Sequence, residues 1–466
     1  MDIHKQQITI NSTFVLRKIS SVFFIIDIKR NKLYELNQTA VDVFSMLSRS
    51  YSIEKIVEEI CERYEMQRSV VQSDIEEVVN TFVEIGVVTT STKDKPGKLV
   101  SVVPKRPFSY YVNNYWSKQE HPYKVKSFEL TPRCNFLCYH CYQGELKESG
   151  KELDTETIKR IIDKMVDIGA LQVVFSGGDP FIRPDFSEIY RYAKYKGLLI
   201  RVFTNGSMIK ESHLSLFKEL PPERIIVSIY GASEETYRKT TKQIGMYNRV
   251  MNNIHEIIHA YIPLSLKLIV SKLTIQDFPA ICQFAKDKGI ELRYAFYIFP
   301  SNTNDTSICD YMIEVKDMLK IDISYQKEFN QKVAQKKNRW MSFYNENGYV
   351  PQYLCDFPHN QFYVDYEGTI FGCSAGLKPL GGNILTDSFE TIWQRFRSVR
   401  NKPMNSINEC VDCKALYFCV NCPADEYSFY GDAEMINEKI CLFAKAKYLY
   451  YYCKISYDDI VKLLIL

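Results

Sequence analysis

The sequence predicts an α/β protein. We expect a partial (β/α)6 barrel between a small α+β, winged-helix-like domain and a C-terminal segment held by metal. Six strand-like runs alternate with amphipathic stretches after residue 125, and βα units in series build a parallel sheet. Short strands and amphipathic helices fill the first 90 residues. From about residue 345 the chain is rich in Cys, Gly and Asn with weak periodicity, which is typical of a segment organised by metal rather than by a large apolar core.

Length and charge exclude several classes of protein. A chain of 466 residues implies more than one domain, and 59 basic against 56 acidic residues give no support for nucleic-acid binding. No apolar run approaches the roughly 20 residues that span a bilayer, and the N-terminus lacks the pattern of a signal peptide. We therefore expect a cytoplasmic protein without a membrane partner. In a reducing compartment the 14 cysteines favour metal ligation over disulfides.

The first predicted domain covers residues 1–90. Strand-like runs lie between residues 8 and 37, with a hairpin turn at 29–31. A helix follows Ser52 as N-cap with Ile53 and Tyr64 at the ends of its apolar face, and a second helix ends at Gly86. A winged-helix domain for DNA is the alternative interpretation. It is weakened by the charge of this domain, ten Lys/Arg against thirteen Asp/Glu.

A linker and two further domains are predicted after it. Residues 91–124 are the linker, because residues 91–126 hold four prolines, eight basic residues, two acidic residues and little periodicity. Residues 125–340 form the barrel, and residues 341–466 form the Cys-rich domain. The barrel strands are predicted in the runs VKSFELT, LQVVFSG, LIRVFTNG, RIIVSIYG, LSLKLIVS and IELRYAFYIF.

The stretch TPRCNFLCYHCYQ directly follows the first barrel strand, where this architecture places chemistry. Its cysteines, Cys134, Cys138 and Cys141, have the spacing C-x3-C-x2-C. A cubane [4Fe–4S] cluster normally takes one thiolate on each iron, so three cysteines leave one iron open for a small molecule. A partial zinc site is the alternative.

Two further motifs follow the next strands, SGGDP at 176–180 and TNG at 204–206. Together with the cysteine triplet they resemble the radical S-adenosylmethionine (SAM) superfamily, in which SAM binds the open iron and is cleaved to a 5′-deoxyadenosyl radical. The glycines of SGGDP would let the backbone approach a ligand. Asp179 stands where this family usually has Glu. The resemblance implies that SAM is contacted by His140, Gly177, Gly178, Asp179, Asn205, Ser228 and Arg238. For Asn205 and Ser228, ordinary turn and capping roles are the alternative.

The C-terminal cysteines have the pattern C-x12-G-x4-C, then C-x2-C-x5-C-x2-C, then C. This resembles the SPASM extension of peptide-modifying radical SAM enzymes, except that two residues instead of three separate Cys419 and Cys422. The resemblance implies two auxiliary [4Fe–4S] clusters, and hence three in all. One would be held by Cys410, Cys413, Cys419 and Cys441. The other would be held by Cys355, Cys373 and Cys422, and either Cys309 or Cys453 could complete it, or an iron could stay open for a substrate thiol. Structural zinc is the alternative.

The first domain resembles the peptide chaperone of pyrroloquinoline-quinone biosynthesis, the RiPP recognition element. That family binds the leader of a ribosomally made precursor peptide as an added strand. We therefore expect a radical SAM maturase that joins a peptide cysteine to a peptide carbon through a thioether, of the sactipeptide or ranthipeptide type. Its electron donor would be a flavodoxin or ferredoxin, and no catalytic side chain is assigned beyond the clusters. The alternatives are a carbon–carbon crosslink, formylglycine formation, and a non-catalytic iron–sulfur or zinc scaffold.

Overall fold

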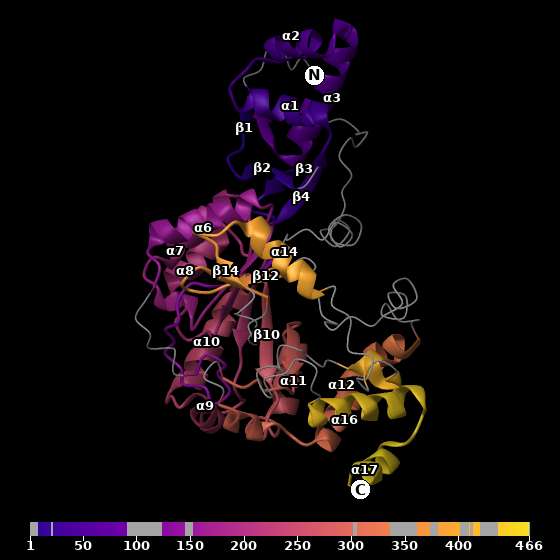
Figure 1. Cartoon of the computed structure of the whole chain (residues 1–466). Coiled ribbons are helices and arrows are strands. Elements are labelled where there is room, and N and C mark those ends of the chain that lie inside the picture. The colour runs from indigo at the N-terminus through magenta and orange to yellow at the C-terminus, as the bar shows by residue number, and fades with distance from the viewer. Residues whose placement is uncertain are drawn as a thin grey trace.

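The computed structural model describes residues 8–19, 22–90, 124–144, 152–301, 305–335, 361–372, 381–400, 410, 413–419 and 437–465. The N-terminal domain caps one end of a parallel sheet that is flanked by helices, and helices α12 (Val315–Gln335), α16 (Glu438–Lys447) and α17 (Tyr457–Ile465) lie beside the other end (Figure 1). The predicted fold class is confirmed. Among the described residues, no helix combines the length and apolarity needed to cross a membrane.

The N-terminal domain contains a three-stranded antiparallel sheet, three helices and a separate strand pair. Its elements are β1 (Ile8–Ile10), β2 (Phe14–Ile19), β3 (Val22–Asp27), β4 (Lys32–Leu36), α1 (Gln38–Leu47), α2 (Ile53–Tyr64), α3 (Arg68–Ile85) and β5 (Val88–Thr90). Strands β2, β3 and β4 are neighbours in that order, and β1 pairs with β5. The β1–β5 pair was not predicted, because three residues per strand are too few for a periodic pattern.

Local signals place the helix ends in this domain. The Ser52 side chain accepts a hydrogen bond from the Lys55 amide (3.3 Å) and begins α2 as predicted. Gly86 ends α3 with φ 84°, a left-handed conformation that favours glycine. The prediction was wrong for Tyr64, which was placed on the buried face of α2 but is 44% exposed at the last turn of that helix.

The barrel contains six parallel strands among the described residues, five of them within the predicted runs and β6 beginning one residue before its run. They are β6 (Lys124–Glu129), β7 (Gln172–Ser176), β8 (Leu199–Thr204), β9 (Arg224–Ser228), β10 (Leu264–Ile269) and β11 (Glu291–Ala295). The intervening helices are α6 (Thr155–Asp167), η4 (Pro180–Ile182), α7 (Phe186–Tyr195), α8 (Glu211–Glu219), α9 (Glu234–Thr241), α10 (Met246–His259) and α11 (Phe278–Asp287). The strands are neighbours in chain order, as successive βα units require.

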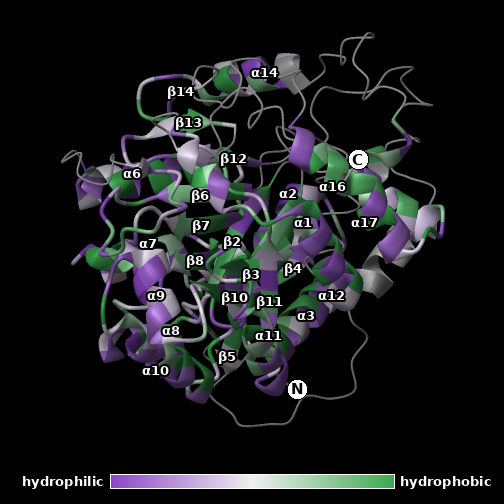
Figure 2. Cartoon of the chain, turned by 90° about the horizontal axis from the view of Figure 1, so that it is seen from below, coloured by the Kyte–Doolittle hydropathy of each residue, from purple (hydrophilic) through white to green (hydrophobic). Residues whose placement is uncertain are grey.

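Alternate strand residues divide the barrel into an outer apolar layer and an inner polar face. On β10, Leu264, Leu266 and Leu268 belong to the main core beneath the helices. Ser265 and Lys267 between them point to the opposite side, because successive side chains of a strand alternate. Hydrophobic residues accordingly gather along the strands, and hydrophilic residues gather on the outer helices (Figure 2).

The C-terminal part extends the barrel sheet. Strand β12 (Gln361–Val364) pairs in parallel with β6, and β13 (Thr369–Phe371) and β14 (Gly382–Asn383) follow it in antiparallel order. The extended sheet therefore has nine strands among the described residues. Sequence analysis did not predict this, because a four-residue strand that pairs far along the chain leaves little local pattern. The remaining elements are η5 (Ser307–Tyr311), α14 (Phe389–Arg400), η7 (Lys414–Phe418) and the π-helical turn η8 (Tyr448–Tyr452).

A buried arginine fastens the N-terminal domain to the barrel. Arg17 of β2 is 6% exposed, and its guanidinium donates to the backbone carbonyl oxygens of Val166 (3.1 Å), Ala170 (2.9 Å) and Lys196 (3.1 Å). Burial lowers its pKa from 12.5 to about 10. Val166 lies in the last turn of α6, and Ala170 and Lys196 lie between a helix and the strand that follows it, so the domain covers the amino-terminal ends of the strands.

A second polar contact lies next to Arg17. Lys194 of α7 is completely buried, and its ammonium donates to Asn31 Oδ1 (2.8 Å) and to the Pro221 carbonyl (2.9 Å). Asn31, in the turn between β3 and β4, donates to the carbonyls of Pro221 and Pro222, both at 3.2 Å. Because these groups satisfy one another's hydrogen bonds, the contact holds the domain in one orientation.

Candidate active site

The cysteine loop leaves the carboxyl end of β6, opposite the N-terminal domain. Cys134, Cys138 and Cys141 are all half-buried. Phe136 between them is completely buried and anchors the loop in the barrel core. The amides of Leu137 (2.9 Å) and Tyr139 (3.1 Å) donate to carbonyls at the end of α9, so backbone bonds also hold the loop.

The two glycines of SGGDP allow this loop to lie against the next one. Gly177 has φ 134°, and a Cβ there would collide with the Thr131 carbonyl oxygen. A Cβ on Gly178 would collide in the same way with the Arg133 carbonyl oxygen. The amides of Gly178 (2.8 Å) and Asp179 (2.9 Å) donate to these same two carbonyls. The described contacts thus explain the glycines by loop packing, and their predicted contact with SAM stays a prediction.

Asp179 joins the SGGDP loop to the end of β8. Its side chain is completely buried and accepts hydrogen bonds from the Thr204 hydroxyl (2.7 Å) and from the amides of Asn205 (2.8 Å) and Phe181 (3.0 Å). Burial raises the pKa of this carboxyl from 3.8 to about 6, although the hydrogen bonds favour the charged form. The shorter side chain of Asp therefore has a structural function here, and its contact with SAM stays a prediction.

Asn205 connects this network to the cysteines. It is 4% exposed, and its amide nitrogen donates to Asn135 Oδ1 (2.9 Å) and lies 3.7 Å from the Cys134 sulfur. Its Oδ1 accepts from the amide (2.8 Å) and hydroxyl (2.6 Å) of Ser207. Donors around a thiolate are typical of iron–sulfur sites, where they tune the reduction potential.

The described C-terminal cysteines lie around η7 and α16. Cys410 is buried, Cys413 and Cys419 flank η7, and Cys441 lies in the first turns of α16. The amides of Cys413 and Cys419 donate to carbonyls three residues earlier, both at 3.2 Å. A small apolar cluster packs η7 against α16. Cys355, Cys373 and Cys422 lie outside the described residues.

Among the described residues, no three His, Cys, Asp or Glu side chains are close enough to hold a single metal ion. A cubane cluster places each thiolate on a different iron, so its ligands stand farther apart than those of one zinc ion. The half-buried, flanking cysteines fit ligands of that kind, and both cysteine sets stay proposed ligands. Cys309 is buried in a cluster with Ile298, Met312 and Tyr139, and its thiol donates to the Ile298 carbonyl (3.2 Å). It therefore belongs to the barrel, whereas Cys453 is exposed after η8.

Comparison with family models gives three matches along the chain. The radical SAM superfamily matches residues 128–285. The model for coenzyme PQQ synthesis protein D (PqqD) matches residues 23–88, and the SPASM iron–sulfur cluster-binding domain matches residues 355–414. This is a radical SAM enzyme. It carries an N-terminal PqqD-like domain and a C-terminal SPASM domain, and such enzymes use SAM and [4Fe–4S] clusters.

Known relatives share parts of this radical SAM chain. An AdoMet-dependent heme synthase of Methanosarcina barkeri is 28% identical over 346 residues, which is 70% of this chain and 97% of the relative. The PqqA peptide cyclase of Granulibacter bethesdensis is 27% identical over 162 residues, 34% of this chain and 43% of the relative. Both matches are too distant to transfer a substrate.

Solved structures share the fold. Streptococcus suis SuiB bound to S-adenosylmethionine aligns with 93% of this chain and 99% of its own, with a TM-score of 0.56 and 13% identity. Native anSMEcpe with bound AdoMet aligns with 73% of this chain and 98% of its own, with a TM-score of 0.53 and 16% identity. These likenesses support the fold class alone.

Tyr230 is a residue of the radical SAM site that sequence analysis missed. It follows β9 and lies beside the cysteine loop. Burial raises its pKa well above 10, and the charges of the nearby thiols raise it further. Its ring packs against Phe136 (5.6 Å between centroids) and His140 (5.9 Å). An aromatic residue two positions after a strand end was the only signal in the sequence.

The remaining predicted contacts with SAM lie at different distances from the cysteine loop. The His140 ring packs on Tyr139 (4.6 Å between centroids) within that loop, and Ser228 ends β9 beside Tyr230. Arg238 lies on the exposed side of α9, and nothing among the described residues brings it to the cysteines. The structure therefore gathers His140, Asn205 and Ser228 around the loop but not Arg238.

Proposed function

We propose that this radical SAM enzyme matures a ribosomally made precursor peptide, whose leader is held by the N-terminal domain. The observation that carries the proposal is a PqqD-like domain fastened by buried polar contacts to a radical SAM barrel. SuiB, which shares the fold, has been solved with a precursor peptide, SuiA. The clusters and SAM would supply hydrogen abstraction from a carbon, and the chain supplies the positioning of the peptide.

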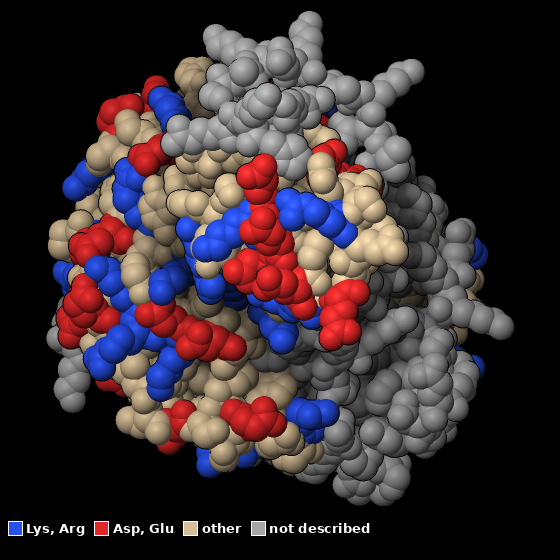
Figure 3. Space-filling view, turned by 90° about the horizontal axis from the view of Figure 1, so that it is seen from above, with Lys and Arg blue, Asp and Glu red and all other residues tan. Residues whose placement is uncertain are grey.

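The leader would bind at the outer edge of β4. Strands β2 and β4 are the two edges of the three-stranded sheet, and β2 carries Arg17 into the barrel contact. An exposed edge offers unpaired backbone donors and acceptors to an incoming strand. On the face seen in Figure 3, at the end of the molecule that carries this domain, Lys and Arg are interspersed with Asp and Glu, a pattern that does not favour DNA binding.

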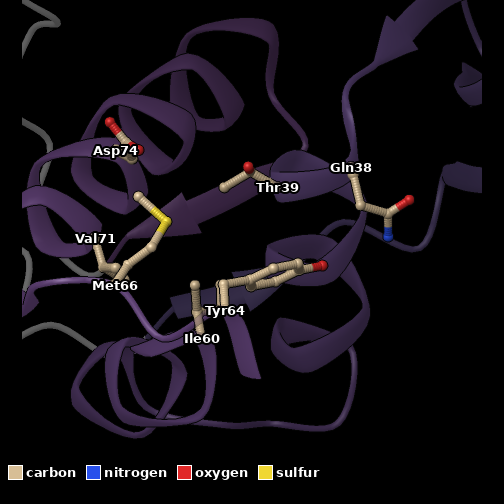
Figure 4. Close-up of a pocket in the computed structure, with 7 residues that line it drawn as sticks. All are labelled: Gln38, Thr39, Ile60, Tyr64, Met66, Val71 and Asp74. Atoms are coloured by element: carbon tan, nitrogen blue, oxygen red, sulfur yellow. The ribbon is translucent and has the colours of Figure 1, made fainter. Parts of the chain in front are cut away.

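A small pocket beyond the end of β4 would hold a leader side chain. The pocket of about 110 Å³ lies between the starts of α1 and α3 and the end of α2 (Figure 4). Its lining is Gln38, Thr39, Ile60, Tyr64, Met66, Val71 and Asp74. The Tyr64 hydroxyl donates to Asp42 Oδ2 (2.6 Å), which fixes the ring at the wall. Tyr64 and Met66 are each 44% exposed, and an apolar leader side chain would cover them.

The reaction we propose joins a peptide cysteine to a peptide carbon through a thioether. The test is anaerobic reconstitution with SAM and the peptide encoded by a neighbouring small reading frame. A thioether and a carbon–carbon crosslink both remove one pair of hydrogens, but only the thioether consumes an alkylatable thiol. Formylglycine formation would instead replace the cysteine sulfur by oxygen. Absence of any peptide product while 5′-deoxyadenosine forms would contradict the maturase proposal.

A small-molecule substrate is the second candidate. The match to the heme synthase spans nearly the whole of that relative, which has 28% identity to this chain. Against it, this chain has a PqqD-like domain, and the heme synthase match leaves almost a third of the chain unmatched. Turnover of an iron porphyrin at a rate above that of any peptide would favour this candidate.

A further inference from the structure

Lys267 is an exposed cation on the inner face of the barrel. It lies in β10, and Leu266 and Leu268 on either side of it pack into the core beneath the helices. Its side chain therefore points away from the helices, into the interior of the barrel. It is nevertheless exposed, so it faces open space and not packed side chains. A lysine in this position is not needed for the core.

The neighbours of Lys267 place it near the carboxyl ends of the strands. It is in register with Ser228, the last residue of β9, and with Arg293 of β11. Its ammonium lies 5.5 Å from the ring centroid of Phe203 in β8. Since Ser228 adjoins Tyr230 and the cysteine loop, Lys267 lies on the wall that leads to the proposed cluster.

A second lysine faces the same interior from β6. The register of β6 against β7 shifts between Val125 and Phe128, whose side chains both belong to the core. The shift turns the two intervening residues, Lys126 and Ser127, inward, and the Ser127 hydroxyl contacts that of Ser176 on β7. The strand order places β6 across the barrel from β10.

The charged residues nearer the amino-terminal ends of the strands form ion pairs with one another. Arg201 forms an ion pair with Glu223 at 2.6 Å. Glu291 forms ion pairs with both Arg224 and Arg293, each at 2.7 Å. Among the described residues no carboxylate forms an ion pair with Lys267. Although water reaches this side chain, the surrounding barrel wall partly desolvates its ammonium and lowers its pKa, and the positive charges of Lys126 and Arg293 lower the pKa further. Lys267 is therefore a cation with no ion-pair partner among the described residues, whereas Glu129, at the end of β6, accepts a hydrogen bond from the Tyr142 hydroxyl (2.7 Å).

We propose that Lys267 binds a carboxylate of the substrate peptide. The enzyme would then select a peptide with an acidic group, from Asp, Glu or the C-terminus, close to the residue that it modifies. A charge-assisted hydrogen bond in a partly desolvated interior is strong and directional, so it would position that residue. This inference rests on the proposed function, because it takes the substrate to be a peptide.

The first test does not need the natural peptide. In the SAM-bound holoenzyme, mass spectrometry measures how fast an N-hydroxysuccinimide ester acylates each lysine. N-acetylglutamate α-methylamide, which has one side-chain carboxylate, is expected to slow acylation of Lys267 in a saturable way. The matched glutamine derivative should not, and neither should change the exposed Lys288. Equal effects of both compounds on Lys267, or no effect, would overturn the proposal.

The second test uses the precursor peptide. Lys267→Gln is expected to raise the KM for the precursor about 10- to 100-fold, Lys267→Arg to restore most of it, and Lys288→Gln to change nothing. Changing the acidic residue beside the modified position to its amide, or amidating the C-terminus, should reproduce the loss and identify the carboxylate. If neither peptide change matters, or if Lys267→Gln weakens SAM binding equally without peptide, the proposal is wrong. If no peptide is modified at all, the proposed function fails, while the acylation test still decides whether Lys267 holds a carboxylate.

Discussion

Replacing Arg17 by alanine should release the N-terminal domain from the barrel. Three hydrogen bonds from a charged donor contribute about 5 to 9 kcal/mol together. Burial of the guanidinium, which lowers its pKa to about 10, offsets roughly 3 kcal/mol of this. We therefore expect Arg17→Ala to weaken docking by about 3 kcal/mol, which increases the opening equilibrium roughly 100-fold.

Hydrogen exchange measures this opening directly. The amides of segments 14–19 and 194–198, on the two sides of the contact, are expected to exchange up to about 100-fold faster in Arg17→Ala. Exchange in α3, within the same domain, should stay as in the wild type. The matched control is Arg68→Ala, because Arg68 is 58% exposed and its only described ion pair is at 3.7 Å.

Arg17→Met keeps most of the apolar stem but removes every donor, so it should open the contact nearly as much as Arg17→Ala. If Arg17→Met exchanges like the wild type, packing and not hydrogen bonding holds the domain. If both variants exchange like the wild type, Arg17 does not fasten the two parts, and the fixed orientation of the leader site is refuted.

Three further predictions follow from the site and the core. Replacing all three cysteines of the loop after β6 by alanine should abolish the formation of 5′-deoxyadenosine but leave the iron of the auxiliary clusters. If three four-iron clusters are present, about 8 of about 12 iron atoms per chain should remain. SAM cleavage by that variant, or stoichiometric zinc in the protein, would contradict the assignment. Met66→Asp should weaken leader binding about tenfold, because it places a charge in the pocket wall. Val70→Asp should not weaken it, because Val70 is equally exposed but lies outside the pocket. Equal losses of leader affinity for the two variants in an anisotropy titration would refute the pocket. Burial lowers the pKa of His213 from 6.5 to about 4, so its neutral form stabilises the fold above pH 6.5. About 3 kcal/mol of the free energy of unfolding is lost as the pH falls to 4. His213→Phe should flatten this decline in the free energy measured by urea unfolding, and an unchanged pH dependence would exclude His213 as its source.

Much of the site could be predicted because its chemistry depends on residue types at fixed local spacing. The cysteine triplet, SGGDP and TNG each lie within a few residues, and each follows a strand whose pattern is also local. Parallel strands bring their carboxyl ends to one edge of the sheet, so the motifs that follow these strands lie close together. The same locality explains why Ser52 and Gly86 were correctly predicted as helix ends.

Tertiary structure alone decided what depends on contacts between distant segments. The role of Asp179 as an internal acceptor for the end of β8 depends on which loops lie side by side, as does the packing of the Tyr230 ring against Phe136 of the cysteine loop. Nothing next to Arg17 in the sequence indicates that it would be buried against three carbonyls at least 149 positions away. In the sequence, Lys267 is likewise only one lysine within an apolar strand. Its significance comes from the pleat that turns it inward and from a barrel interior that leaves it without a carboxylate among the described residues.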